Sequence, residues 1–375
     1  MPKVAIIVGT RPEAIKMAPI AIEARRRRGV KPVLILTAQH RQMCDEVLEI
    51  FRLKPDHDLD IMKPRQSLFE VTARLVRKLE KVLAAEKPDI VLVQGDTTST
   101  FVGSLAAYYL KIPVGHVEAG LRTYRKYSPF PEEINRKLTT ALTDLHFAAT
   151  ATARDSLLSE GVPGRRISVV GNPVIDALLH VASKKYRFSS EELAAIDFRR
   201  NKVIAVTAHR RESWGRSFEN MMRALREVAR RHTEALVVFP VHPNPNVRGT
   251  VKRILGGAER VLLIDPLGYK DFVKLLKSCS FIITDSGGIQ EEAPSLGKPV
   301  LLMREVTERP EAVKAGAVKI VGTSTRRIVS AAAELLESDK AYRKMLVRKN
   351  PYGDGHAAEK IMDVIAGRLD EVERP

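Results

Sequence analysis

Residues 281–303 read FIITDSGGIQEEAPSLGKPVLLM, and apolar and polar segments alternate within them as in a parallel α/β sheet. The run Phe281–Thr284 predicts a strand, a helix is expected from about Ile289, and Pro299–Met303 predicts the next strand. Between the first strand and the helix, two glycines let the backbone turn tightly and point its N–H groups toward a helix N-terminus. That geometry suits a phosphate. The pair Glu291–Glu292, expected in the first helical turn, is placed to reach ribose hydroxyls, so the stretch predicts a seat for a nucleotide diphosphate.

The same alternation extends over most of the chain. One series of short apolar runs and helical segments extends from Val4 to Val170, and a second series extends from Val203 to Val321. Such a pattern is typical of parallel sheets covered by helices on both faces. We therefore predict an α/β protein with two doubly wound, Rossmann-like domains whose parallel sheets face each other across a cleft. The expected division is an N-terminal domain at 1–171, a nucleotide-binding domain at 172–355, and a C-terminal helix within 356–375 that packs back on the N-terminal domain.

Composition narrows the class of protein. The chain has 375 residues, of which 44% are hydrophobic, and it suits two ordinary domains. No apolar run is long enough to span a bilayer and no signal peptide is evident, so a cytoplasmic location is expected. Two distant cysteines, Cys44 and Cys279, favour neither a disulfide framework nor structural zinc. The net charge of +17 raises the alternative of nucleic-acid binding. Its spread along helices, with 5% aromatic residues, favours solvated charge instead.

The turn after the first strand also has the character of a binding loop. Gly9 is followed by Thr-Arg-Pro-Glu, and the cations Arg11 and Lys16 flank the start of the next helix. Because strand ends line the cleft in this fold, we expect both to meet phosphate or sugar, although a tight turn with a solvated arginine is the alternative. The chain's one match to a dinucleotide fingerprint, Gly353–Ala358, does not follow a strand. This argues against bound NAD.

Three carboxylates and a histidine are candidates for acid–base chemistry. Asp96 and Glu118 follow consecutive strands, Glu132 is expected near the start of a helix, and His209 follows the first strand of the second domain. Crowded carboxylates raise one another's pKa and can divide the roles of acid and base. Taken singly, each could instead cap a helix or form a salt bridge, and His209 could be structural. His116, inside a strand, favours packing, and no spacing of His, Asp or Glu indicates a metal site.

Eight segments taken together carry a resemblance to a known family: GTRPEAIK, QGDTTST, HVEAGLRT, SPFPEEINR, TAHRRES, DSGGIQEE, ERPEAV and NPYGDG. The chain closely resembles the non-hydrolysing UDP-N-acetylglucosamine 2-epimerases, which are similar to two-domain GT-B glycosyltransferases. The resemblance implies reversible conversion of UDP-GlcNAc to UDP-ManNAc, supporting the supply of cell-surface polysaccharide precursors. In that family UDP leaves by anti elimination to give 2-acetamidoglucal and then adds back. Neither a cofactor nor a metal is implied.

The resemblance also assigns residues. Asp96, Glu118 and Glu132 match the catalytic carboxylates and His209 matches the essential histidine, but which carboxylate is base and which is acid does not follow. The positions that match UDP contacts are Arg11, Lys16, Phe272, Ser286, Gly287, Gly288, Glu292 and Arg309. The bacterial family binds a second UDP-GlcNAc as an allosteric activator, and the matching positions here are Gln39, His40, Gln42, Arg65, Gln66, Arg210 and His242.

Other readings of the resemblance stay open. A homodimer is implied, without a nucleic-acid or membrane partner. The nearest rival is an epimerase acting on a UDP-2,3-diacetamido-uronic acid, because the carboxylates alone do not distinguish substituents at C3 or C6. A GT-B glycosyltransferase is a second rival, and it would need an acceptor. A nucleic-acid-binding protein is a third, and it would show salt-sensitive binding to DNA or RNA.

Overall fold

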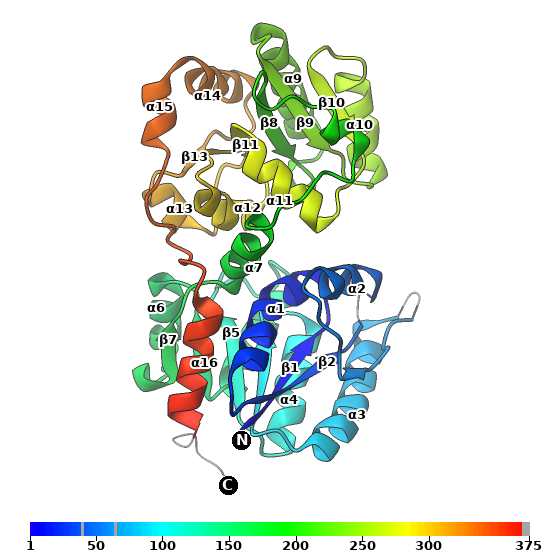
Figure 1. Ribbon diagram of the computed structural model, residues 1–375, viewed down its shortest axis with the longest axis vertical. Helices are drawn as coiled ribbons and strands as arrows, with labels where there is room; N and C mark the ends of the chain where they lie inside the picture. The colour runs from blue at the N-terminus through cyan, green and yellow to red at the C-terminus, as the bar shows by residue number, and fades with distance from the viewer. Residues whose placement is uncertain (39–40, 64–65, 370–375) are drawn as a thin grey trace. The chain divides into compact units, whose positions relative to one another are not determined.

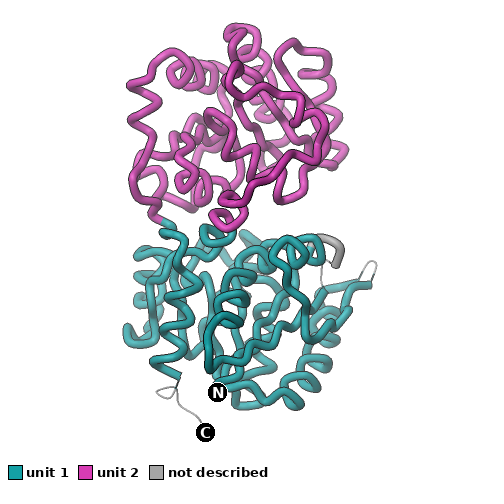
Figure 2. Tube along the Cα trace, viewed as in Figure 1, with its two compact units in different colours: residues 1–177, 352–375 teal, residues 178–351 magenta. Residues whose placement is uncertain are grey.

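The computed structural model describes residues 1–38, 41–63 and 66–369, leaving out the side chains of 41–43. The chain divides into two compact units, Met1–Ala177 with Tyr352–Pro375, and Leu178–Pro351 (Figure 2). The predicted divisions after residues 171 and 355 lie a few residues away, for a physical reason. Asn172 donates its backbone N–H to Tyr352 O over 2.6 Å, and Tyr352 is buried. These contacts attach both segments to the first unit.

The first unit is built on a parallel sheet that has seven strands among the described residues, in the order β3-β2-β1-β4-β5-β6-β7 (Figure 1). Its elements in chain order are β1 (Lys3–Val8), α1 (Arg11–Arg26), β2 (Lys31–Leu36), α2 (Arg41–Ile50), β3 (His57–Asp58), α3 (Leu68–Glu86), β4 (Ile90–Gln94), α4 (Thr98–Tyr109), β5 (Val114–Ala119), α5 (Glu132–Leu142), β6 (Leu145–Ala148), α6 (Ala151–Ser159), the 3₁₀ turn η1 (Gly164–Arg166), β7 (Ile167–Val169), the start of α7 (Pro173–Ala182) and α16 (Ala357–Arg368).

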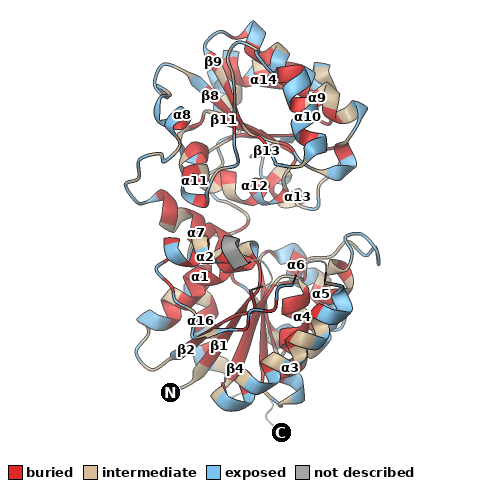
Figure 3. Cartoon of the chain, turned by 90° about the vertical axis from the view of Figure 1, so that its right-hand side faces the viewer, coloured by how far each residue is buried: buried red, intermediate tan, exposed pale blue. Residues whose placement is uncertain are grey.

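The core of this unit lies on both faces of the sheet. In the parallel register Ile6 of β1 stands between Leu34 of β2 and Leu92 of β4, and all three side chains are buried (Figure 3). Helix α3 covers part of the sheet with a stripe of buried residues from Val71 to Leu83 at four-residue spacing, which is one face of a helix. Helix α16 packs against α1, where the Arg27 guanidinium lies 2.7 Å from the Asp363 carboxylate.

The second unit repeats the plan with a parallel sheet of six strands among the described residues, ordered β10-β9-β8-β11-β12-β13. Its further elements are α8 (Glu191–Ala194), β8 (Lys202–Thr207), η2 (Arg211–Ser213), α9 (Arg216–Arg231), β9 (Ala235–Pro240), α10 (Pro245–Leu255), β10 (Val261–Ile264), α11 (Tyr269–Ser278), β11 (Phe281–Thr284), α12 (Gly287–Glu292), η3 (Ala293–Leu296), β12 (Val300–Leu302), α13 (Pro310–Lys314), β13 (Val318–Ile320), α14 (Thr325–Glu337) and α15 (Asp339–Lys344).

Both sheets reverse their strand order at one point, between β1 and β4 in the first unit and between β8 and β11 in the second. In open parallel sheets, ligands bind beyond the carboxyl ends of the strands at such a switch point, because the loops diverge there and leave a crevice. These four strands are followed by the loop residues Gly9–Thr10, Gly95–Thr97, Ala208–Arg210 and Asp285–Ser286, and Arg11 and Gly287 begin the helices after the first and last of these loops. Within the described residues, no helix is long and apolar enough to cross a membrane.

Candidate active site

Glu118 stands at the carboxyl end of β5 in an unusual backbone conformation. Its φ is 63°, in the left-handed region, and the pairing of β5 with β6 shifts register between Val117 and Ala119. A non-glycine residue in this region costs roughly 1–3 kcal/mol, and such strained residues occur in active sites as well as in turns and helix ends such as Lys87. Its carboxylate accepts hydrogen bonds from the Lys16 ammonium at 2.8 and 2.6 Å, from the Asn172 amide at 2.9 Å, and from the Gln94 amide. Lys16, predicted to contact substrate, thus forms an ion pair with the candidate catalytic carboxylate Glu118.

Asp96, in the loop after β4, is held by an arginine. Arg136 of α5 donates to Asp96 Oδ2 from Nε at 2.9 Å and from Nη2 at 2.6 Å, and Asn135 donates to the Asp96 carbonyl at 2.9 Å. The arginine is nine-tenths buried and the Asp96 side chain is 26% exposed, so the pair is only partly shielded from solvent. The structure thereby joins the β4 loop to the first two turns of α5.

Glu132 is the first residue of α5, where the sequence predicts it. Its Oε2 is buried and has no hydrogen-bond partner among the described residues. The adjacent Glu133 is used differently. Burial opposes its ionisation, but the N–H groups of Thr123 and Tyr124 and the Arg136 guanidinium outweigh burial and lower the pKa of this carboxyl. Glu133 therefore anchors the loop before α5, and Glu132 keeps an uncommitted oxygen.

Two buried histidines lie beneath these carboxylates, opposite each other on β5 and β6. His116, expected to be a packing residue, bonds through Nε2 to Gly95 O at 2.7 Å and so supports the turn that leads to Asp96. Burial lowers the pKa of His116 to about 4 and that of His146 to about 3, with Arg122 adding repulsion to both. Both imidazoles are neutral in the folded protein near neutral pH.

Stability should therefore decrease as the pH falls from 7 to 5. In this window the unfolded chain binds protons on both imidazoles, whose ordinary pKa is near 6.5, while the folded protein excludes them. By pH 4 the loss from His116 alone amounts to roughly 3 kcal/mol. We expect urea unfolding between pH 7 and 5 to show a shallower pH slope for His116→Gln or His146→Gln than for the wild type. The exposed His356→Gln should keep the wild-type slope, and equal slopes in all four proteins would contradict the assignment.

In the second unit, the helix that follows the predicted diphosphate loop begins earlier in the sequence than expected. Helix α12 starts at Gly287 with Ser286 as N-cap, rather than near Ile289, because glycine is tolerated in a first turn whose N–H groups are not yet bonded. Glu291 and Glu292 consequently lie in the second turn, which corrects the predicted first-turn placement. Glu291 is buried and pairs with the Nε of Arg309, so it is Glu292, half-buried, that corresponds to the predicted ribose contact.

Arg309 and Gly287 are in close contact. A Cβ on Gly287 would lie 2.7 Å from Arg309 Nη1, so only glycine leaves this guanidinium where it is. Nη1 also lies 3.1 Å from the Glu308 carboxylate. Gly288 is exposed at the loop, and Phe272 lies half-buried on α11. The structure thus brings three of the predicted UDP contacts, Ser286, Gly287 and Arg309, to one edge of the second sheet.

His209 is held by a residue that the sequence did not single out. Asp285 is fully buried, and its Oδ2 accepts the backbone N–H of His209 at 2.8 Å and of Arg210 at 2.9 Å. Its Oδ1 lies 3.6 Å from His209 Nδ1 and has no hydrogen-bond partner among the described residues. The imidazoles of His209 and His242 stack with centroids 5.4 Å apart. Burial and the neighbouring His209 lower the pKa of His242.

The predicted activator residues are described only in part. Gln39, His40 and Arg65 lie outside the described residues, as does the side chain of Gln42. Gln66 Oε1 accepts the backbone N–H of Lys63 at 3.2 Å and Arg74 Nη1 at 3.1 Å. Arg210 lies 3.9 Å from the Glu212 carboxylate. Within the second unit, Arg210 and His242 both neighbour His209.

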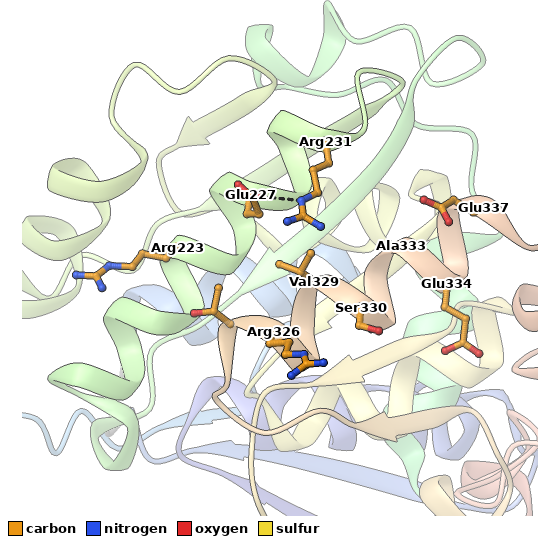
Figure 4. Close-up of a pocket in the computed structure, with 10 residues that line it drawn as sticks. Arg223, Glu227, Arg231, Arg326, Val329, Ser330, Ala333, Glu334 and Glu337 are labelled. Carbon is orange, nitrogen blue, oxygen red and sulfur yellow. Dashed lines mark hydrogen bonds and ion pairs between the residues drawn. The ribbon is translucent and has the colours of Figure 1, made fainter.

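A surface groove of about 890 Å³ in the second unit is separate from these residues (Figure 4). It is lined by α9 and α14 and by none of the predicted site residues. Its charges are mixed, with Arg223, Glu227 and Arg231 on α9 and Arg326, Glu334 and Glu337 on α14, and Arg231 pairs with Glu227 at 2.5 Å. This balance gives the groove no preference for an anionic nucleotide.

The predicted residues therefore fall into two half-sites. The carboxylates with Arg11 and Lys16 belong to the first unit, and His209 with the diphosphate loop belongs to the second. Supporting residues that sequence reasoning missed are Glu13, Gln94, Arg136, Asn172 and Asp285. Within the described residues, no cluster of His, Cys, Asp or Glu could hold a metal ion.

Comparison with known proteins gives a consistent result. A profile of the UDP-N-acetylglucosamine 2-epimerase family matches residues 22–366. The UDP-N-acetylglucosamine 2-epimerase of Escherichia coli strain K12 is 52% identical, over 97% of this chain and 98% of that protein. The UDP-GlcNAc 2-epimerase of Neisseria meningitidis, solved bound to UDP-GlcNAc, is 48% identical with a TM-score of 0.89, over 97% of this chain and 100% of that one.

A more distant relative has the same fold. The Methanocaldococcus jannaschii UDP-GlcNAc 2-epimerase, solved with UDP-GlcNAc and UDP, is 34% identical with a TM-score of 0.77, over 97% of this chain and 99% of that one. These similarities confirm the predicted α/β class of two Rossmann-like, parallel-sheet domains of GT-B-like type.

Proposed function

Because the chain belongs to the UDP-N-acetylglucosamine 2-epimerase family, whose members are isomerases, we propose that it reversibly converts UDP-GlcNAc to UDP-ManNAc. The observation that carries the proposal is the pair of half-sites. In the first unit Asp96 follows β4 at the switch point and Glu118 lies at the end of the neighbouring β5; in the second unit His209 and the turn at 285–287 follow β8 and β11 at the switch point. Acid–base groups and a seat for a leaving diphosphate are what an elimination mechanism requires.

In the proposed reaction a carboxylate removes the C2 proton while the C1–O bond breaks and UDP leaves with the bonding electrons. The intermediate, 2-acetamidoglucal, has a C1=C2 double bond. UDP oxygen then attacks C1 while C2 takes a proton from the opposite face, so no net proton or electron is gained or lost. Because the C2 proton is not adjacent to a carbonyl, its removal must be coupled to loss of the stabilised UDP anion.

The contacts of the carboxylates support a division of roles. Lys16 pairs with Glu118 at 2.6 Å and Arg136 pairs with Asp96 at 2.6 Å, so a cation holds each of these carboxylates in place. Glu132 has a buried oxygen without a partner among the described residues, which leaves that oxygen available for a hydrogen bond to the substrate. We therefore assign proton acceptance to Glu118 or Asp96 and proton donation to Glu132.

His209 and the loop at 286–288 would stabilise the departing UDP. The N–H groups at the start of α12 and the Arg309 guanidinium favour negative charge, and His209 could donate to a phosphate oxygen. Glu292 would hold the ribose and Phe272 the uracil. Arg11 is the first residue of α1, whose N-terminus also favours an anion.

The decisive experiment is proton NMR of UDP-GlcNAc with the pure enzyme in D₂O. We expect UDP-ManNAc to appear and deuterium to replace hydrogen at C2 in both sugars. Absence of exchange at C2 would overturn the proposal. Parallel incubation with a UDP-2,3-diacetamido-uronic acid separates the nearest rival, since faster epimerisation of that sugar would favour it. Sugar transfer to an added acceptor, without epimerisation, would indicate a glycosyltransferase.

We further propose that a second UDP-GlcNAc activates the enzyme. The support is the family pattern at Gln39, His40, Gln42, Arg65 and Gln66, together with Arg210 and His242, whose position beside His209 would couple the activator to the leaving group. Such activation shifts a population between conformations, because the activator binds one of them better. UDP-ManNAc alone should be turned over slowly until UDP-GlcNAc is added. Full initial activity on UDP-ManNAc alone would contradict this.

The remaining proposals concern context. We propose a homodimer, supported by exposed aromatic residues on one helix, where Tyr108 and Tyr109 of α4 are 60% and 66% exposed. We also propose that the enzyme acts in the cytoplasm and supplies precursors for cell-surface polysaccharide.

A further inference from the structure

Glu13 is a buried carboxylate between the two loops that flank the switch point of the first sheet. It is only 2% exposed. Its Oε2 accepts the backbone N–H groups of Gly9 and Thr10, both at 2.7 Å. Its Oε1 accepts the hydroxyl of Thr97, and the Thr100 hydroxyl lies at 3.1 Å. One carboxylate thus bonds the turn after β1 and the turn after β4.

Those two turns carry residues of the proposed chemistry. The β1 turn ends at Arg11, and the β4 turn carries Asp96 immediately before Thr97. The turns are also packed without spare room, since a Cβ on Gly9 would lie 2.3 Å from the Ser99 hydroxyl of α4. A change in the hydrogen bonds of Glu13 is therefore expected to shift the backbone of both turns.

A helix cap alone does not require this burial. The same capping box occurs at the start of α3, where Ser67 and Glu70 bond each other at the surface. Glu13 makes the equivalent bonds of α1 but is placed in the interior, where burial raises the pKa of its carboxyl. Its hydrogen-bond partners in the described part of the chain are uncharged groups, so no cation offsets its desolvation. A costly burial that a surface glutamate avoids points to a further role.

We infer that Glu13 is a positioning residue, which fixes the Arg11 turn against the Asp96 turn and thereby sets the geometry of the first half-site. The inference rests on the proposed epimerase function. Misplacement of a reacting group by about 1 Å costs on the order of 100-fold in rate, so a positioning residue is detected in kcat.

The test compares Glu13→Gln with Glu23→Gln, assayed by C2 deuterium exchange well below the melting temperature of each protein. Glutamine has the shape of glutamate, but its amide N–H₂ donates where the carboxylate accepts, so the Thr97 and Thr100 hydroxyls must turn from donors into acceptors and lose a charge-assisted bond. We expect kcat to fall about 10- to 100-fold in Glu13→Gln. Glu23 is a matched control, because it is a buried glutamate of the same helix, 8% exposed, that pairs with Arg26 and Arg27 at the opposite end.

A second pair of variants approaches the contact from the other loop. Thr97→Val removes the hydroxyl that reaches Glu13, and Thr97→Ser restores it. If Glu13 and Thr97 act together, the valine variant should lose kcat like Glu13→Gln, the serine variant should recover it, and the double variant Glu13→Gln/Thr97→Val should be no slower than the worse single one.

The outcomes are distinct. Glu13→Gln and Thr97→Val with wild-type kcat in the folded protein, or with only a lowered melting temperature, would overturn the inference. So would an equal loss of kcat in Glu23→Gln. No C2 exchange in the wild type would instead overturn the proposed function, and the two failures are thereby told apart.

Discussion

Glu118→Gln is expected to lower kcat by about 1,000-fold while leaving the protein folded. Proton transfer by a positioned side chain contributes roughly 10²- to 10⁴-fold, and an amide cannot accept the C2 proton. The substitution also leaves the Lys16 ammonium, now 2.6 Å from the carboxylate, without its anion. Deuterium exchange at C2, measured with UDP-GlcNAc in D₂O, should fall together with epimerisation, because both depend on the same proton transfer.

Glu86→Gln is the matched control for this variant. Glu86 also pairs with a lysine, Lys3, at 3.1 Å, but Lys3 starts β1 at the amino-terminal edge of the sheet, opposite to Glu118. We expect Glu86→Gln to retain kcat within about threefold, since general acid–base catalysis is not touched. Retention of kcat in Glu118→Gln would remove Glu118 from the chemistry and leave it a partner of Lys16 alone.

Asp285→Asn should be the second large effect, with kcat reduced about 100-fold or more. Asp285 has no exposed surface, and one of its oxygens accepts two backbone N–H groups, so an asparagine must keep its carbonyl there. Its amide N–H₂ then faces His209 Nδ1, which lies 3.6 Å from the present carboxylate oxygen. The substitution thus replaces a negatively charged oxygen beside Nδ1 with an amide, and the same change beside a catalytic histidine is costly in enzymes that rely on such a pair.

Asp176→Asn tests whether replacing any buried aspartate by asparagine would lower kcat as Asp285→Asn is expected to do. Asp176 is 8% exposed, accepts the backbone N–H of Ala358 at 2.8 Å, and keeps a second oxygen without a hydrogen bond among the described residues. Like Asp285 it is a buried aspartate that accepts a backbone N–H and keeps an oxygen without a hydrogen bond, but its neighbouring histidine is His356 rather than His209. We expect lower stability but nearly unchanged kcat. If Asp285→Asn keeps wild-type UDP affinity and kcat, then Asp285 only holds the backbone of the loop at His209 and Arg210.

Much of the fold follows from local pattern. Strands such as β4 and β11 are short apolar runs between turn residues, and their alternation with helices predicts parallel sheets without reference to any long-range contact. Element starts are less certain. The predicted start of α12 near Ile289 was two residues too late, because glycine is a poor helix former in general but is acceptable in a first turn.

The candidate site was predictable to the extent that a motif contains its own chemistry. Glu13 stands three residues after Thr10, a capping-box spacing that could have drawn attention to it. Its bond to Thr97 spans 84 positions and has no sequence signal. Asp285 was in view beside Ser286, but its role depends on β8 lying next to β11, where Thr207 stands opposite Thr284.

The sequence by itself determined the α/β class, the two domains and the residue types of the reaction, because periodicity and motif spacing are local properties. Tertiary structure alone decided which charges meet. Lys16 reaches Glu118 across 102 positions and Arg136 reaches Asp96 across 40, because parallel strands bring their carboxyl ends to one edge whatever their separation in the chain. The positive φ of Glu118 has the same origin, since the packing around the end of β5 over-determines a conformation that the residue alone would avoid.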